Sequence, residues 1–276
     1  MSGKLVCFGE MLVRLSAPQG EMLLQTPQLA AYIGGAEANV AICVSRLGGS
    51  AAMATTLPDN PLGHAARDEL RRHGVDVAAV RFTHGRMGLY FLTPGAVLRP
   101  SEIVYDRAGS AFAEKADATV WATALAGAGM LHVSGITPAV SATGSDAALA
   151  AIGAANAANI PVSFDGNYRA QLWESWDGRP RESLRELVSL SDIFFGNHRD
   201  VGLLLDREFD ASSPAARRAC AEAAFREFPT LTMLASTSRE TLSADHHRLG
   251  ARVDRRDGGA EAPALEITHI VDRIGA

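Results

Sequence analysis

Short apolar runs alternate with amphipathic stretches along most of the chain, and the two patterns repeat in a regular order. The apolar runs predict strands at residues 4–9, 50–56, 79–83, 88–94, 130–135, 160–165, 192–197 and 231–236. Between them, apolar positions at helical spacing predict helices at residues 62–73, 121–126, 145–158, 184–190 and 215–227. Strands that alternate with helices favour a mostly parallel sheet with helices on both faces, so the pattern predicts an α/β fold.

One segment interrupts this alternation. Residues 86–109 contain two β-like runs, at 89–92 and 103–105, on either side of a Pro94-Gly95 turn. This pattern predicts a β hairpin that projects from the α/β body. Such a projection is a natural lid, although an antiparallel edge with exposed tyrosines is the plainer interpretation.

A second irregular segment lies near the N-terminus. Residues 11–15 alternate weakly and could extend into a β excursion. Pro18 and Pro27 argue against a long helix there, so residues 20–32 are expected to be irregular. We therefore expect the lid to be built from segments near 11–33 and 86–109.

The whole chain is organised around a glycine turn that opens directly into a helix, at residues 33–41. Gly34 and Gly35 can adopt a positive φ and allow another group to approach the backbone closely. The helix that follows ends at Gly48-Gly49, a typical C-terminal cap. Its free N–H groups and dipole would suit a polyhydroxylated or anionic ligand. An ordinary strand-to-helix turn explains the same pattern, and both interpretations stay open on local grounds.

Composition narrows the class of protein further. The 276 residues are 47% hydrophobic and 21% charged, which is typical of a globular chain with a sizeable core. The net charge of -5 gives no electrostatic case for nucleic acid or an anionic membrane surface. No apolar run approaches the roughly 20 residues of a membrane-spanning helix. The widely separated Cys7, Cys43 and Cys220 read as buried thiols in a reducing compartment, so we expect a cytoplasmic protein.

Polar clusters follow three of the predicted strands, at residues 165–169, 197–200 and 236–239. In a parallel sheet, ligands bind outside the carboxyl ends of the strands. We therefore expect these clusters to contribute to one site. Residues 245–247, Asp-His-His, suggest a metal site, but without a third ligand an exposed loop is favoured, and residues 254–259 read as a charged loop.

Several of these stretches together resemble the ribokinase-like (PfkB) carbohydrate kinases. The sequence Gly-Gly-Ala-Glu-Ala-Asn-Val-Ala at residues 34–41 is similar to the family's N-terminal motif, and the likeness is strongest to its 2-keto-3-deoxygluconate kinases. Supporting pieces follow in family order at residues 88–90, 105–111, 134–136, 165–173 and 271–276. The resemblance implies a three-layer ribokinase-like fold with a small β lid, and ATP-dependent phosphorylation of a sugar or sugar acid.

The resemblance also implies which residues hold the sugar. Backbone at Gly34 and Gly35 and the side chain of Asn39 would contact sugar oxygens, while Tyr90 and Tyr105 would supply lid surfaces that exclude water. Two further residues, Arg107 and Arg169, would bind a substrate carboxylate, because guanidinium groups bind carboxylates bidentately. For each arginine, a solvated surface charge is the alternative.

For ATP and Mg²⁺, the resemblance places Asn167 and Asn197 near the phosphates. Asp200 stands where the family carries a glutamate, and it could organise Mg²⁺-bound water. Asn197 and Asp200 also suit a helix start, which is the alternative interpretation. Ser236, Thr237 and Arg239 align with a nucleotide-binding loop that usually carries lysine and glycines, whereas this sequence has Ala-Ser-Thr-Ser-Arg-Glu at residues 235–240.

The C-terminal end departs most from the family pattern. Residues 271–276 resemble the approach to a Gly-Ala-Gly-Asp turn whose aspartate takes a proton from the attacking hydroxyl, and the sequence ends at Gly275-Ala276. On this interpretation residues 1–276 form an incomplete kinase domain, and we expect this polypeptide to phosphorylate little or nothing.

Three alternative functions remain. The first is a catalytically dead sugar-binding protein, and the second is a related kinase for fructose, ribose or a nucleoside. A dinucleotide-dependent oxidoreductase is the third and least favoured, because the first strand lacks a G-x-G-x-x-G turn. The expected partners are a small sugar acid and, through the β lid, a second copy of the chain.

Overall fold

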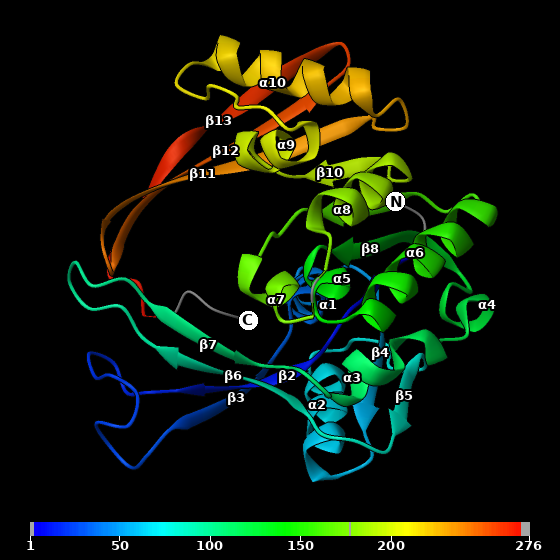
Figure 1. Ribbon diagram of the computed structural model, residues 1–276, viewed down its shortest axis with the longest axis vertical. Coiled ribbons are helices and arrows are strands. Elements are labelled where there is room, and N and C mark those ends of the chain that lie inside the picture. The colour runs from blue at the N-terminus through cyan, green and yellow to red at the C-terminus, as the bar shows by residue number, and fades with distance from the viewer. Residues whose placement is uncertain (1–2, 177, 272–276) are drawn as a thin grey trace.

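The computed structural model describes residues 3–176 and 178–271 and contains two sheets (Figure 1). The larger sheet has nine strands in the order β13-β12-β11-β10-β9-β8-β1-β4-β5. Its strands are β1 (Lys4–Phe8), β4 (Ala51–Pro58), β5 (Val80–Thr83), β8 (Ala128–Ser134), β9 (Val162–Asp165), β10 (Ile193–Phe195), β11 (Met233–Ser243), β12 (His246–Arg255) and β13 (Gly258–Ile267). All pairs from β5 across to β11 are parallel, and β11-β12-β13 form an antiparallel meander. The predicted mostly parallel α/β sheet is confirmed.

Helices cover both faces of the parallel part. They are α1 (Ala36–Arg46), α2 (Pro61–Arg72), α3 (Ala111–Lys115), α4 (Trp121–Ala124), α5 (Ile136–Ala139), α6 (Ala142–Ala157), α7 (Ala170–Glu174), α8 (Pro180–Ser189), α9 (His198–Leu205), α10 (Pro214–Glu227) and a 3-10 turn, Ala116–Ala118. Alternate residues of β1 feed two cores: Val6 and Phe8 face the larger core with α3 and α6, and Cys7 faces a smaller core with α1 and α2. The three-layer arrangement follows from this alternation.

Side-chain caps fix where several helices begin. Asn60 accepts hydrogen bonds from the N–H groups of Leu62 and Gly63 at the start of α2, and proline follows directly at N1. Ser141 and Ser213 cap α6 and α10 in the same way. These local signals explain why the helix starts predicted from the sequence lie within a few residues of the observed ones.

The second sheet is the predicted lid, and it has four strands in the order β3-β2-β6-β7. They are β2 (Leu12–Ser16), β3 (Ala30–Gly34), β6 (Gly88–Thr93) and β7 (Glu102–Asp106). β6 and β7 form the expected hairpin, and β2 pairs parallel to β6. β3 occupies the end of the segment expected to be irregular, since it completes the edge of this sheet beside β2.

The C-terminal part of the chain contradicts three expectations. Residues 254–259 are not a loop, because β12 and β13 meet there in a tight hairpin. Residues 245–247 are not an exposed loop either, since His246 and His247 begin β12 and His247 is buried. The third error concerns residues 236–239, which continue β11 as a strand that pairs with β12. We call the antiparallel strands β11, β12 and β13 the ribbon. Alternation of apolar and polar residues is weak in the ribbon, which is why the sequence did not reveal its strands.

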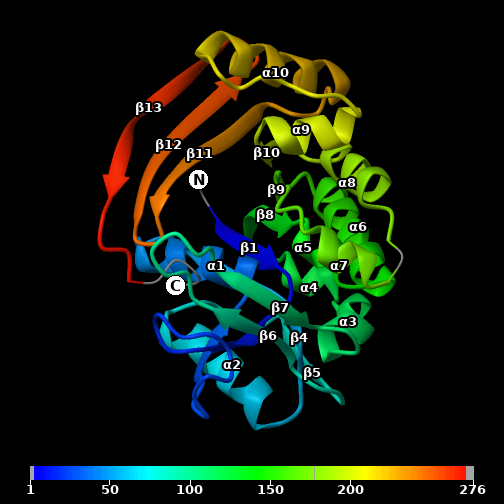
Figure 2. The ribbon, with the colours of Figure 1, turned by 60° about the vertical axis from the view of Figure 1, so that its left-hand side comes forward.

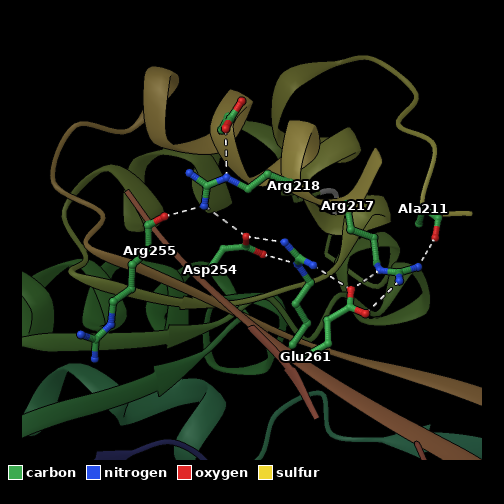
Figure 3. Close-up of polar contacts among 8 residues, drawn as sticks. Ala211, Arg217, Arg218, Asp254, Arg255 and Glu261 are labelled. Carbon is green, nitrogen blue, oxygen red and sulfur yellow. Dashed lines mark hydrogen bonds and ion pairs between the residues drawn. The ribbon is translucent and has the colours of Figure 1, made fainter. Parts of the chain in front are cut away.

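Charged side chains fasten the ribbon to α10 (Figure 3). Asp254, only 1% exposed, accepts hydrogen bonds from Arg252 at 2.6 and 2.7 Å and from Arg218 of α10 at 3.2 Å. Glu261 accepts hydrogen bonds from Arg217 of α10 and from Arg252. The arginines thereby hold the pKa of Glu261 at about 2, well below its usual range. The ribbon is a fixed part of the body.

The ribbon then curves toward the lid, as both views show (Figures 1 and 2). The N–H of Ala244, at the β11-β12 turn, donates to the carbonyl of Val97 in the β6-β7 connection at 2.7 Å. The lid tip and the ribbon tip therefore meet, and a cavity of about 210 Å³ lies where they join.

Candidate functional site

The site forms where the lid meets the carboxyl edge of the large sheet. β1, β8 and β9 end there at Phe8, Ser134 and Asp165, each followed by a glycine, and the N-terminus of α1 lies beside them (Figure 2). Two of the polar clusters predicted from the sequence, at residues 165–169 and 197–200, follow strands that end along this edge, which is the edge where parallel sheets bind ligands. The third, at residues 236–239, continues β11 instead.

Close approach explains the glycine pair better than unusual backbone dihedrals do. Gly35 is the N-cap of α1 with φ 163°, an extended value open to any residue, so the expected positive φ is wrong. A Cβ on Gly35 would lie 2.5 Å from the carbonyl oxygen of Glu10, whereas a Cβ on Gly34 would meet no heavy atom within 4 Å. Gly35 thus lets α1 pack on the chain leaving β1, and Gly34 presents open backbone to the site. The predicted stop at Gly48 is confirmed, since α1 ends at Arg46.

Glu37, inside the glycine motif, connects α1 to β8. It is 0% exposed, and its Oε1 accepts hydrogen bonds from the N–H and hydroxyl of Ser134 and from the hydroxyl of Thr137. Burial raises the pKa of Glu37. This residue positions the helix whose N-terminus faces the site, and its side chain does not reach solvent.

The two lid tyrosines predicted to contact substrate lie side by side. Tyr90 of β6 and Tyr105 of β7 are register partners, and their ring centroids are 6.4 Å apart. Arg14 of β2 and Tyr32 of β3 extend the same row, and Arg14 stacks over the Tyr32 ring at 4.3 Å. Asn39 lies in α1, where its N–H bonds to the carbonyl of Gly35.

Arg107, predicted to bind a substrate carboxylate, lies at the base of the lid. It pairs with Glu10 at 2.6 Å, and the two side chains are 5% and 1% exposed. The alternative of a solvated surface charge is therefore wrong for Arg107. Arg169, at the start of α7, is exposed, and one guanidinium nitrogen donates to the carbonyl of Tyr168.

Two carboxylates share the space beside Arg169. Burial, then the negative charges of Asp200 and Glu37, raise the pKa of Asp165 to about 6, and burial raises that of Asp200. The charge of Arg169 acts in the opposite direction on both. Asn167, with φ 36°, turns the chain between Asp165 and Arg169, and its N–H donates a hydrogen bond to the carboxylate of Asp165 at 3.2 Å.

Asn197 and Asp200 form a capping box at the start of α9. The Asn197 side chain accepts from the N–H of Arg199, and Asp200 accepts from the N–H of Asn197 at 2.8 Å. The interpretation of Asn197 and Asp200 as a helix start is therefore confirmed. In this arrangement the carboxyl of Asp200 lies beside Gly166 at the sheet edge.

The fit to a magnesium ion follows from the donor set. Within the described ranges, no group of three or more His, Cys, Asp or Glu side chains is placed to ligate a metal. Asp165 and Asp200 nevertheless bring two acidic side chains together, and the charge of Arg169 acts to lower the pKa of both, with His198 acting in the same direction on Asp200. Such a set fits a hydrated Mg²⁺ held through water better than a directly ligated one.

The nucleotide residues expected on a loop do not gather in one place. Ser236, Thr237 and Arg239 all lie on β11 opposite β12. Because side chains alternate along a strand, Ser236 faces the side of α10, and Thr237 and Arg239 face the other side. Gly275 and Ala276, expected to support catalysis, lie outside the described residues.

Sequence reasoning missed four residues of this region: Glu10, Arg14, Glu37 and Ser110. A signal existed for two of them, since charged residues directly after an apolar strand and inside an alanine-rich helix start are unusual positions. The buried-thiol interpretation holds for Cys7 and Cys220 and is wrong for Cys43, which lies on the exposed side of α1.

Comparisons with known proteins agree with this architecture. A model of the pfkB family of carbohydrate kinases matches residues 2–276. The 2-dehydro-3-deoxygalactonokinase of Haloferax volcanii is 36% identical over all of this chain and 81% of that protein. The crystal structure of 2-dehydro-3-deoxygluconokinase from Thermotoga maritima has a TM-score of 0.90 at 35% identity, covering 98% of this chain and 82% of that one. A fructokinase of Solanum tuberosum is 32% identical over 70% of this chain and 59% of that protein.

The chain belongs to the PfkB family of carbohydrate kinases, and its fold is the ribokinase-like α/β fold of that family. The family is one of phosphotransferases that act on sugars, and this chain is similar to its 2-dehydro-3-deoxy-sugar kinases. None of the helices in residues 3–176 and 178–271 has the length and apolar character needed to cross a bilayer.

Proposed function

We propose that this chain binds a 2-keto-3-deoxy sugar acid for ATP-dependent phosphorylation, most specifically 2-keto-3-deoxygluconate, giving the 6-phosphate. The observation that supports this best is the combination of open space at Gly34, the Tyr90–Tyr105 pair on the lid and an exposed Arg169 after β9. Gly34 offers backbone to sugar hydroxyls, the tyrosines cover an apolar sugar face, and a guanidinium suits a carboxylate.

Charge favours an acid over a neutral hexose. The pKa values of Asp165 and Asp200 are raised chiefly by burial, and the positive charge of Arg169 acts against that rise in both. Arg107 lies at the base of the lid with one carboxylate partner, and it is a second contact for the substrate's carboxylate. A neutral sugar such as fructose would leave both arginines without a substrate partner.

The galactonate epimer is a second candidate. It is favoured by the 36% identity to the Haloferax volcanii 2-dehydro-3-deoxygalactonokinase, which covers the whole chain. The two acids differ only in the orientation of one hydroxyl, so Asn39 and the lid tyrosines are the residues we expect to discriminate them.

ATP is the proposed phosphoryl donor, with Mg²⁺ to offset charge on the transferring group. Asp200 and Asp165 would hold the hydrated ion, and Asn167 and Asn197 would donate to phosphate oxygens. Thr237 and Arg239 stay proposed nucleotide contacts, on the strand face that looks away from α10, with Ser236 on the other face. The cytoplasmic location stays a prediction from the sequence.

We further propose that additional chain completes this kinase domain. The face of β10–β13 away from α10 leaves Phe195 and Val253 43% and 39% exposed. Apolar side chains on a sheet face are normally covered by another layer. The proposed cover is a segment like the part of the Thermotoga maritima relative that lies outside the 82% matched by this chain.

The lid is also proposed as a homo-oligomer contact. On its face away from Tyr90, a row of apolar residues comprises Ala31, Leu15, Phe91 and Val104, and Val104 is 48% exposed. A concentration-dependent mass in sedimentation that falls to the monomer in Val104→Asp would support this contact. A monomer at all concentrations would refute it.

Calorimetric titration tests the substrate. The purified chain is titrated with 2-keto-3-deoxygluconate and its galactonate epimer, with fructose and gluconate as competitors. Saturable binding of one keto-deoxy acid that weakens about tenfold in Arg169→Ala supports the proposal. Binding of fructose alone by a chain that circular dichroism shows to be folded would refute it. An ADP-release assay on the same sample tests the expectation of little or no turnover.

A further inference from the structure

The two segments that carry the chain into and out of the lid are joined by one buried carboxylate, that of Glu10. Glu10 lies between β1 and β2, where the chain enters the lid, and it is 1% exposed. Arg107 and Ser110 lie after β7, where the chain leaves the lid for α3. Glu10 therefore connects the segment that enters the lid to the segment that leaves it, with sequence separations of 97 and 100 residues.

Each oxygen of Glu10 has its own partner. Oε2 accepts the Nε–H of Arg107 at 2.6 Å, and the Nη2 of Arg107 is equally close. Oε1 accepts the hydroxyl of Ser110 at 2.5 Å. Ser110 in turn caps α3, since its Oγ accepts the N–H of Ala113 at 3.1 Å. The carboxylate is thus held by a helix of the body while it holds an arginine of the lid.

The backbone around Glu10 is shaped to admit this arrangement. A Cβ on Gly88, the first residue of β6, would collide with Oε1 of Glu10. The start of β6, where the chain enters the lid again after β5, therefore lies directly against the same carboxylate. A second ion pair, Arg86 with Asp106 at 2.7 Å, lies nearby but is half exposed.

The ion pair with Glu10 uses the Nε and Nη2 side of the Arg107 guanidinium and does not use Nη1. A guanidinium presents two edges to carboxylates: one formed by Nε and Nη2, and one formed by Nη1 and Nη2. Glu10 occupies the first edge. Because the guanidinium is planar and rigid, fixing its first edge also fixes the orientation of its second edge. Arg107 is therefore orientated before any ligand binds. Preorganised donors bind more tightly because little rotamer freedom is lost on binding.

We propose that Glu10 is the positioning residue for Arg107: it clamps one edge of the guanidinium to the body so that the other edge meets the substrate carboxylate. This rests on the proposed sugar-acid function. Glu10 does not touch the substrate itself, and its effect on binding passes through Arg107.

A double-mutant cycle on the full chain tests this. Affinity for 2-keto-3-deoxygluconate is measured by calorimetry for the wild type, Glu10→Gln, Arg107→Gln and the double variant. Glu10→Gln is expected to weaken acid binding about tenfold. The double variant is expected to bind as weakly as Arg107→Gln alone, because Glu10 has nothing left to orientate.

Two controls separate positioning from a loosened lid. Arg86→Gln breaks the neighbouring ion pair without touching Arg107, and Glu102→Gln removes an exposed lid carboxylate. Thermal melting shows that each variant is folded. We expect acid affinity within about twofold of the wild type in both controls.

Several results would overturn the inference. Unchanged acid affinity in Glu10→Gln, equal losses in Glu10→Gln and Arg86→Gln, or fully additive effects in the cycle would each assign Glu10 a purely structural role. A folded wild type that binds fructose and no keto-deoxy acid would instead refute the proposed function, and this inference with it.

Discussion

Glu37 accepts two hydrogen bonds from one residue, Ser134, through its backbone N–H at 3.0 Å and its hydroxyl at 2.6 Å. A third comes from the hydroxyl of Thr137 at 3.0 Å. The glycine motif is thus joined to the end of β8 from within the core. The stretch that the family resemblance marks as sugar-binding is also a structural junction of the sheet edge.

Replacing Glu37 by alanine is expected to lower the free energy of unfolding by about 3–5 kcal/mol, because the buried N–H and hydroxyl of Ser134 lose their acceptor and the Thr137 hydroxyl keeps only the carbonyl of Phe8 at 3.3 Å. Glu37→Gln should cost about 1 kcal/mol or less, since burial raises the pKa of Glu37 and favours a neutral side chain, and the amide oxygen still accepts. Urea denaturation at pH 7 measures both. Equal losses in the two variants would contradict the hydrogen-bond account.

The adjacent glycines offer a matched pair. In Gly35→Ala the new Cβ would lie 2.5 Å from the carbonyl of Glu10, and we expect a loss of about 1–3 kcal/mol in stability. In Gly34→Ala nothing lies within 4 Å, so stability should stay within about 0.5 kcal/mol of the wild type.

Sugar affinity is expected to fall in Gly34→Ala, the variant whose stability should not change. If sugar hydroxyls approach the backbone at Gly34, its methyl substituent weakens sugar affinity about tenfold in a fully folded protein. Calorimetry alongside urea denaturation makes both measurements on one preparation. A stable Gly34→Ala that binds sugar like the wild type would remove Gly34 from the proposed site.

Local sequence signals were sufficient for most of the parallel sheet. Apolar runs such as 130–135, and capped helices such as α2 after Asn60, carry their structure in neighbouring residues. The ribbon of β11, β12 and β13 does not, because its charged residues Asp254 and Glu261 are held by Arg218 and Arg217 of α10 as well as by Arg252 within the ribbon. Those contacts depend on residues about forty positions away, which periodicity cannot reveal.

The site divides in the same way. The residue types of the glycine motif and of Tyr90 and Tyr105 make them candidates from the sequence alone. The pairing of Glu10 with Arg107 spans 97 positions and has no local signature. A sequence shows that Arg107 carries a charge, and only the fold shows which carboxylate neutralises it.

Asp254 provides a test of how the ribbon is held. Asp254→Asn leaves Arg252 and Arg218 without their buried carboxylate, so we expect a loss of about 3–5 kcal/mol in the free energy of unfolding. The control is Glu240→Gln, which breaks a half-exposed pair with Arg248 and should cost less than about 1 kcal/mol. Similar losses in the two variants would show that burial of Asp254 does not matter.

The carboxyl of Asp165 predicts how stability changes with pH. Its pKa in the folded protein is about 6 against an ordinary value of 3.8, chiefly because of burial and then because of the charge of Asp200. Between these two values the folded state keeps a proton that the unfolded state has lost. This contribution to stability is therefore fully present below about pH 4 and is lost as pH rises through 6.

Asp165→Asn removes this titration while keeping an acceptor for the N–H of Asn167. We expect the variant to gain on the wild type as pH rises from 4 to 7, by up to about 3 kcal/mol. Urea denaturation of both proteins across that range measures the difference, so that other titrating groups cancel. A difference that is flat with pH would mean that Asp165 is ordinarily ionised, and that the negative charge proposed to attract Mg²⁺ is already compensated within the protein.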